Sequence, residues 1–469
     1  MHVRAMTAAL ATTFTLSACG GDDTSVPLPQ PTSTTSSCSL SQRQAWVRSQ
    51  LDEWYLFPNL LDTSVQASSF GDVQSYIDAL VAPARAQSRD RFFTYITSIK
   101  EETEFFERGE TAGFGIRLSY DSASRRVFVT EAFENAPAFA QGLDRGVELL
   151  AIGDNPGNLT GIPGLFAEGG SAAVSNALGP NTVGTTRTFR IRKNGVESEV
   201  TVSKADYQIQ PLSPRYGSRI LDLGNGRKVG YVNLRTFIDT AEPALRSAFD
   251  SFRQQGITEV IVDVRYNGGG LVRIGQLFGD LLQDNRQGQI FGYLSFRASK
   301  SSENNTLTFT DRPEGIRATK IAFIGTGGTA SASELIMNNM TPYLSNVALV
   351  GSDTFGKPVG QIALDKAECD DRLRSVSFKT DNANRQGEYF TGIASVFPNT
   401  CRAADDFTVQ LGEPYEASIR TSIEYINGGV AMCAPITSGE QGTQSVRSTR
   451  ELLRPERPTV AQIETPGLF

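Results

Sequence analysis

The sequence predicts a mixed α/β protein, because its second half alternates apolar, strand-like stretches with amphipathic, helix-like ones. The strand-like stretches are 229–234, 259–264, 321–324 and 347–350, and the helix-like stretches are 241–254, 274–282 and 332–340. Strands that alternate with helices favour parallel pairing with right-handed crossovers. We therefore expect a core domain over residues 215–440, followed by a C-terminal tail over 441–469.

The composition agrees with this class. The 469 residues are 39% hydrophobic and 20% charged, which is ordinary for a globular protein of several domains. The formal net charge is −7, and no block of Lys and Arg interrupts it. A nucleic-acid partner is therefore not expected, because such partners require a basic patch.

The N-terminus has the features of an export signal. A positive start is followed at 5–15 by an apolar run that is too short to span a bilayer. Leu16-Ser17-Ala18-Cys19 resembles a bacterial lipobox, which implies removal of residues 1–18 and acylation of Cys19. The alternative is a plain secretory signal with an incidental cysteine.

The residues after this signal predict a tether. Residues 19–40 are rich in Pro, Ser, Thr and Gly, a composition typical of a flexible linker. Gly20 supplies no acidic retention signal, which favours the outer membrane of a Gram-negative cell. We expect a periplasm-facing protein of the bacterial cell envelope, held at the membrane by lipid.

Histidine and cysteine usage restricts the chemistry. The single histidine is His2, inside the segment expected to be removed. A Ser-His-Asp triad, a Cys-His dyad and a His-ligated metal are thereby excluded from the mature chain. Because the mature chain has no histidine, a nucleophile would need Lys, a carboxylate or a terminal amine as its base. No metal or cofactor is expected.

Four further cysteines predict disulfides. An even number of cysteines in an exported protein favours disulfide bonds, and the spacings do not match a zinc site. Three pairings remain open. The cysteines are Cys38, Cys369, Cys401 and Cys433.

Two smaller domains precede the core. Helix-like periodicity at 43–55 and 73–81 predicts a small N-terminal helical domain over residues 41–100. Residues 105–205 contain strand-like stretches around a short helix-like one, an order that resembles a PDZ domain. The strand-like stretches are 126–130, 146–152, 186–193 and 197–202, and the helix-like stretch is 136–141.

A loop before these strands carries the resemblance further. Gly113, Phe114, Gly115 and Ile116 stand where PDZ domains offer backbone N–H groups to a peptide's terminal carboxylate. The implied mode of binding is β-augmentation by protein or peptide substrates with free C-termini. One departure is Arg145-Gly146-Val147, where Pro-Gly-Asp is usual.

Two glycine-rich turns are candidates for chemistry. Asp263 to Gly270 places three glycines after a strand, where free N–H groups can hold an oxyanion or simply form a tight turn. Gly325 to Glu334 places Ser331 between a strand and a helix, where it is either an exposed nucleophile or a helix cap. A phosphate loop does not fit, because Lys357 is followed by Pro358.

Thr354 to Gln361 is the third motif. Lys357 has mainly apolar neighbours there, and burial would lower its pKa and make the free amine a usable base. Together the three motifs resemble those of the C-terminal processing peptidases, or tail-specific proteases. That resemblance implies a crotonase-like core with an inserted PDZ domain, Ser331 as nucleophile, Lys357 as general base and Gln361 as its partner.

The resemblance also implies the reaction. Ser331 would attack a peptide carbonyl, with N–H groups of Ala332 and Gly269 holding the oxyanion. Pro358 departs from the family, which has glycine after the lysine. The alternative is a non-catalytic, PDZ-bearing scaffold lipoprotein that binds peptides.

Overall fold

The computed structural model describes residues 37–224, 226–437 and 450–469. The expected signal peptide 1–18, Cys19 and most of the linker lie outside the described residues. The described chain is mixed α/β, as predicted, with sheets of six, five and seven strands and a two-stranded ribbon. No helix within these ranges combines the length and the apolar character needed to cross a membrane.

The six-stranded sheet has the order β10-β11-β12-β15-β16-β19. Only β10 runs antiparallel to its neighbour, so the predicted parallel pairing is confirmed. The strands are β10 (Ser218–Asp222), β11 (Lys228–Asn233), β12 (Glu259–Asp263), β15 (Lys320–Gly325), β16 (Val347–Gly351) and β19 (Thr400–Arg402).

Helices cover both faces of this sheet. Alternate side chains of a strand point to opposite faces: Val260 and Phe323 pack with α7, α8 and α9, while Ile261 and Ala322 pack with α10. The helices are α7 (Ala241–Gln254), α8 (Val272–Leu282), α9 (Ala332–Met340) and α10 (Ala417–Gly428). Helices α7 and α9 begin and end where the sequence predicts them.

The five-stranded sheet was not predicted. It has the order β1-β18-β13-β14, and β17 also pairs with β18. N-terminal helices pack on it, because residues of α1 and α2 share a buried cluster with Val359, Leu373 and Val376. The elements are β1 (Tyr95–Ser98), β13 (Ile290–Phe296), β14 (Asn305–Thr308), β17 (Val359–Lys366), β18 (Asp371–Asn382), α1 (Leu40–Trp54), α2 (Val73–Leu80), α3 (Ala82–Ala86) and α4 (Ile99–Thr103).

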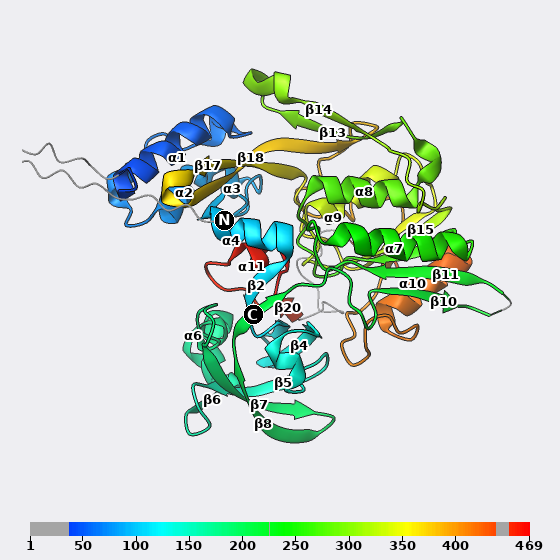
Figure 1. Ribbon diagram of the computed structural model, residues 1–469, viewed down its shortest axis with the longest axis horizontal. Helices are drawn as coiled ribbons and strands as arrows, with labels where there is room; N and C mark the ends of the chain where they lie inside the picture. Colours follow the sequence, from blue (N-terminus) through cyan, green and yellow to red (C-terminus); the bar gives the residue numbers. More distant parts are fainter. Residues whose placement is uncertain (1–36, 225, 438–449) are drawn as a thin grey trace, which may run out of the picture.

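The seven-stranded sheet forms a separate lobe with its own apolar core, in the lower part of Figure 1. Its order is β20-β3-β4-β5-β7-β8, with β6 on β5, and the ribbon of β2 and β9 connects it to the rest. The elements are β2 (Glu110–Gly113), β3 (Ile116–Asp121), β4 (Arg126–Ala132), α5 (Pro137–Ala140), β5 (Glu148–Gly153), β6 (Leu159–Gly161), α6 (Ile162–Ala177), β7 (Thr186–Lys193), β8 (Val196–Ser203) and β9 (Ala205–Gln208).

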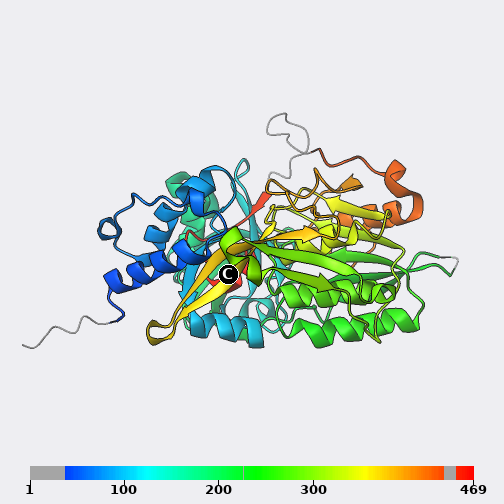
Figure 2. The same ribbon diagram turned by 90° about the horizontal axis from the view of Figure 1, so that it is seen from above.

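The last part of the chain returns to the centre of the molecule. Strand β20 (Arg450–Leu452) pairs with β3, and helix α11 (Val460–Glu464) follows it. Figure 1 shows α11 between α4 and the lower lobe, and in Figure 2 the red C-terminal part of the chain lies between the blue N-terminal helices and the green and yellow elements of the core.

Two disulfides select one of the three open pairings. Cys38 pairs with Cys369 across 331 residues, which ties the start of α1 to the turn after β17. Cys401 pairs with Cys433 across 32 residues, which joins β19 to the segment after α10.

Candidate active site

Ser331 lies at the junction of β15 and α9, as expected. Its φ of 55° is in the left-handed region, which a serine adopts only when its surroundings impose it. The glycine loop after β12 lies against it: a Cβ atom added to Gly269 would come within 2.7 Å of Ser331 Cβ. A glycine is therefore required at 269 for the two turns to approach so closely.

Glu334 joins the serine turn to the lysine turn. Its Oε2 accepts hydrogen bonds from the N–H groups of Ser331 at 3.0 Å and Lys357 at 2.7 Å. Its Oε1 accepts from Gly356 N–H at 2.6 Å and from the Thr354 hydroxyl. The carboxyl is fully buried, and burial raises the pKa of Glu334 to about 7. The sequence indicated only a favourable charge at the first turn of α9.

Lys357 is 5% exposed, in agreement with its apolar sequence neighbours. Its Nζ donates a hydrogen bond to Gln361 Oε1 at 2.8 Å, and Gln361 Nε2 donates to Phe93 O. Burial lowers the pKa of Lys357, while the nearby Glu464 and Asp90 carboxyl groups partly oppose that change. A lowered pKa favours the neutral amine that a general base requires.

The two candidate catalytic side chains are not in direct contact. Across the described ranges, no hydrogen bond joins Ser331 Oγ to Lys357 Nζ. Their backbones are held together through Glu334, and Gln361 lines the same cavity as Ser331. Catalytic hydrogen bonds are often long without substrate and tighten only when it is bound.

The expected oxyanion donors differ in availability. Ala332 is the first residue of α9, where a helix leaves its N–H groups without intrahelical partners. The Gly269 N–H instead donates to Asn267 Oδ1 at 2.9 Å. Gly270, which the sequence analysis did not single out as a donor, lines the cavity beside Ser331 and is a further candidate.

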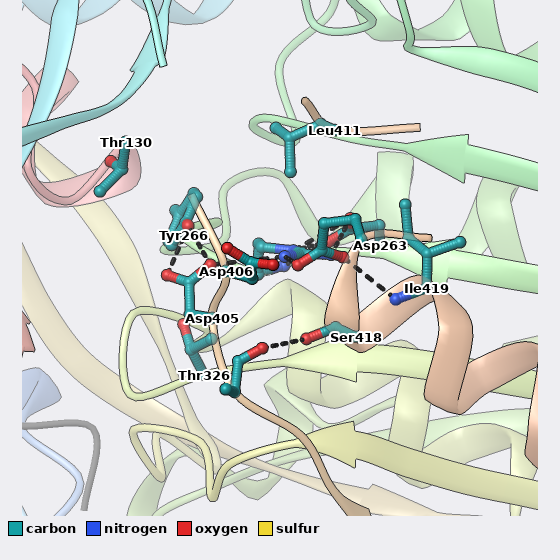
Figure 3. A network of polar contacts seen from close by, with 12 residues as sticks. Thr130, Asp263, Tyr266, Thr326, Asp405, Asp406, Leu411, Ser418 and Ile419 are labelled. Atoms are coloured by element: carbon teal, nitrogen blue, oxygen red, sulfur yellow. Dashed lines mark hydrogen bonds and ion pairs between the residues drawn. The ribbon is translucent and has the colours of Figure 1, made fainter. Parts of the chain in front are cut away.

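A buried ion network underlies the glycine loop. Asp263 accepts hydrogen bonds from Tyr231 and Arg265, and the Arg265 guanidinium makes two bonds to Glu416, at 2.9 and 2.8 Å. Asp263 therefore holds the end of β12 rather than facing the cavity. Tyr266 in turn donates to Asp405, as Figure 3 shows.

Arg145, noted as a departure in the sequence, connects the lobe to this network. Its guanidinium donates to Thr130 O at 2.6 Å inside the lobe, and to Tyr266 Oη at 3.1 Å and Asp406 O at 3.0 Å outside it. Its side chain is 2% exposed. Sequence reasoning missed this role, because an arginine in a loop is normally solvated.

The cavity at Ser331 is small. Its volume is about 110 Å³, and its walls include Gln361, Arg374, Tyr95 and Glu464. Pockets for drug-sized ligands are roughly 300–1,000 Å³, so a peptide does not fit in this arrangement. Within the parts of the chain that are described, no group of three or more His, Cys, Asp or Glu could hold a metal ion.

The loop from Gly113 to Ile116, which is expected to bind a terminal carboxylate, lies at the edge of the lobe. Phe469 of the same chain occupies it. The N–H groups of Gly115 and Ile116 donate to Phe469 O, at 2.8 and 3.3 Å. The side chains of Phe114, Ile116 and Phe469 belong to one buried apolar cluster. The sequence analysis missed Phe469, although its apolar side chain is of the kind expected to fill this pocket.

Comparisons with known proteins agree with the position of the motifs. Residues 228–380 match the model for Peptidase family S41. This match includes the glycine loop, Ser331, Lys357 and Gln361.

Two curated relatives are peptidases by name. Carboxyl-terminal-processing peptidase 3, chloroplastic, of Arabidopsis thaliana is 25% identical over 270 residues, which are 56% of this chain and 49% of the relative. The carboxyl-terminal-processing protease of a Picosynechococcus species is 26% identical over 261 residues, or 53% of this chain and 55% of the relative. The chain thus spans about half the length of the curated relatives it matches.

One solved structure shares the fold. A protein assigned to the S41 proteases from Bacteroides fragilis superimposes with a TM-score of 0.61 at 21% identity. The match covers 82% of this chain and 97% of that one. At this identity the similarity concerns the fold alone.

Proposed function

We propose that this chain is a member of peptidase family S41 and acts as a serine endopeptidase with a Ser331–Lys357 dyad, since residues 228–380 match the family model. The observation that carries the proposal is the buried Lys357, whose Nζ is held by Gln361 and whose backbone shares Glu334 with the Ser331 turn. A solvated lysine would stay protonated at neutral pH, whereas burial lowers the pKa of this one.

The proposed reaction is acyl transfer. Neutral Lys357 takes the proton from Ser331 Oγ as Oγ attacks the scissile carbonyl carbon. The Ala332 N–H and one N–H of the glycine loop, from Gly269 or Gly270, stabilise the oxyanion; losing one such donor typically costs about a hundredfold or more. Protonated Lys357 then gives its proton to the leaving amine, and water releases the acyl group from Ser331.

We also propose that the lobe formed by the seven-stranded sheet selects the substrate. We propose that it is PDZ-like and that the loop from Gly113 to Ile116 binds the C-terminal residue of an unfolded protein. Two observations support this: the loop N–H groups point at a backbone oxygen, and Phe114 and Ile116 form an apolar pocket. Charge-assisted bonds to a terminal carboxylate would add selectivity for free C-termini.

Location is also a proposal. The lipobox-like residues before Cys19 support an exported lipoprotein of the bacterial envelope. Cys19→Ser should release the protein from membranes, because stable attachment requires several acyl chains on the terminal cysteine. Labelled palmitate that fails to enter the wild-type precursor would contradict this part.

The deciding experiment compares substrates that differ only at their ends. An unfolded protein with a free, apolar C-terminus should be cleaved by the wild-type chain, and its amidated form roughly tenfold more slowly, because a charged hydrogen bond contributes about 1.5–3 kcal/mol. Ser331→Ala should cleave neither form and still bind the free one. Binding without any cleavage by the wild-type chain would favour the non-catalytic scaffold.

A further inference from the structure

The tail segment, which we define as residues 459–469, contacts the lobe as an added strand. Phe469 N–H donates to Ile116 O at 2.9 Å, and Leu118 N–H donates to Gly467 O at 2.8 Å. Leu468 forms an antiparallel bridge with Arg117. This pattern is β-augmentation of the β3 edge, the mode by which such an edge binds an extended peptide.

The tail segment also fills the end of this groove. Phe469 is 2% exposed. Its oxygen accepts the two loop N–H groups that would otherwise be available to a substrate. A Cβ atom added to Gly113 would lie 3.1 Å from the Phe469 carbonyl carbon, so loop and tail segment are in close contact. A second peptide cannot occupy the same edge while the tail segment is seated there.

The other end of the tail segment lies at the glycine loop after β12. Gly268 N–H donates to Glu464 O at 2.9 Å. The Glu464 side chain forms part of the wall of the Ser331 cavity, and its Oε2 is buried without a hydrogen-bond partner in the described structure. Removing the tail segment would therefore take away one wall of a cavity that is too small for a peptide.

The side chain of Arg117 connects the tail segment in the groove with the glycine loop after β12. Its Nη1 donates to Tyr266 O at 2.7 Å and to Pro466 O at 2.6 Å, and its Nε donates to Glu131 at 3.0 Å. The guanidinium is fully buried while the tail segment is seated. Departure of Pro466 would remove one of the two acceptors of Nη1; the other is Tyr266 O, two residues before Gly268.

We propose that the tail segment is an intramolecular occupant of the peptide groove, which keeps the Ser331 cavity closed until a competing peptide with an apolar, carboxyl-terminal residue displaces it. The occupancy rests on the contacts above, and its effect on cleavage rests on the peptidase function proposed here. Attachment in the same chain gives the tail segment an effective concentration on the order of millimolar, so an external peptide must compete against it.

A binding experiment tests the occupancy without catalysis. The probe is a fluorescent peptide with the sequence of residues 460–469 and a free carboxyl end, and the proteins are full chains carrying Ser331→Ala. Adding Phe469→Asp places a charge in the apolar pocket and should release the tail segment. We expect this chain to bind the probe at least tenfold more tightly than the chain with an unaltered tail.

Two further chains serve as control and second variant. Glu456→Gln changes an exposed residue just before the tail segment and should bind as the unaltered chain does. Gly467→Val places a side chain at a φ of 87°, within 2.9 Å of Arg117 Cγ, and should repeat the gain if Phe469→Asp fails to fold. Equal probe affinity in the unaltered chain and in the folded tail variants overturns the proposal.

A cleavage experiment then tests the consequence. The substrate is a short peptide blocked at both ends, which cannot use the groove, and the chains retain Ser331. Phe469→Asp should cleave it at least tenfold faster than wild type, and the unlabelled probe peptide should accelerate the wild-type chain. If the tail variants bind the probe more tightly but no chain cleaves the substrate, the peptidase proposal fails and occupancy of the groove by the tail segment stands. If the substrate is cleaved but all chains bind the probe equally, the proposed occupancy of the groove fails.

Discussion

The backbone N–H groups of Ser331 and Lys357 donate to the same oxygen, Glu334 Oε2, at 3.0 and 2.7 Å. The proposed nucleophile and the proposed base come from different turns, after β15 and after β16. A single buried carboxyl therefore fixes the distance between them. Positioning of this kind matters because small displacements of reacting groups reduce catalytic rates strongly.

Glu334→Gln should destabilise the protein. The amide nitrogen cannot accept a hydrogen bond, so two of the four donors around this side chain lose their acceptor. A buried donor left unpaired costs about 1–3 kcal/mol, so we expect the free energy of unfolding to fall by about 2 kcal/mol or more. Denaturant unfolding measures this free energy, and Glu456→Gln, at an exposed residue, is the matched control. An equal fall in the free energy of unfolding in both variants would contradict the role of Glu334 in holding the two turns together.

The stability difference between wild type and Glu334→Gln should also depend on pH. Burial raises the pKa of Glu334 from 4.5 to about 7, so the folded state binds this proton more tightly than the unfolded state. The Glu334 contribution is therefore full below pH 4.5 and is lost as the pH rises through about 7. The advantage of wild type should shrink over that interval, and an advantage that grows would contradict the assignment.

Glu464→Gln should shift the pH dependence of cleavage. The Glu464 carboxylate raises the pKa of Lys357, as do Asp90 and Glu334, while burial and Arg374 lower it. Removing the Glu464 charge lowers the Lys357 pKa further, so more of the neutral base is present at a given pH. The acidic limb of the kcat/KM profile, which reports the free enzyme, should move to lower pH; an unchanged limb in a folded variant would count against Lys357 as base.

Gln361→Ala should reduce kcat more than it changes KM. The amide accepts from Lys357 Nζ and donates to Phe93 O, so its loss frees the lysine to adopt other rotamers. General-base catalysis contributes about 10²–10⁴-fold, and we expect roughly tenfold or more of that to be lost. Steady-state kinetics measures the split, and a rise in KM alone would assign Gln361 to substrate binding.

The motifs of the candidate site could be recognised in the sequence because each one is local. Ser331, Lys357 and Gln361 stand in short stretches of recognisable spacing, and helices α7 and α9 have clear periodicity. Helix α6 was missed because two adjacent glycines, Gly169 and Gly170, interrupt it with non-helical backbone.

The tail contacts could not be predicted in the same way. Helix α11 has only five residues, too few for a periodic signal, and its partners are distant in sequence. The sequence analysis assigned no role to Arg117 and noted Arg145 only as a departure from the PDZ pattern, yet both are buried. Their burial depends on carboxylates and carbonyl groups that only the folded chain brings together.

A double-mutant cycle at Ser331 and Lys357 tests the central claim most directly. The measurement is turnover of an unfolded protein with a free, apolar C-terminus by wild type, Ser331→Ala, Lys357→Ala and the double mutant, each shown to be folded. If the two residues act as one catalytic unit, each single substitution abolishes turnover and the double mutant is no worse than either. Full activity in Lys357→Ala would contradict the account.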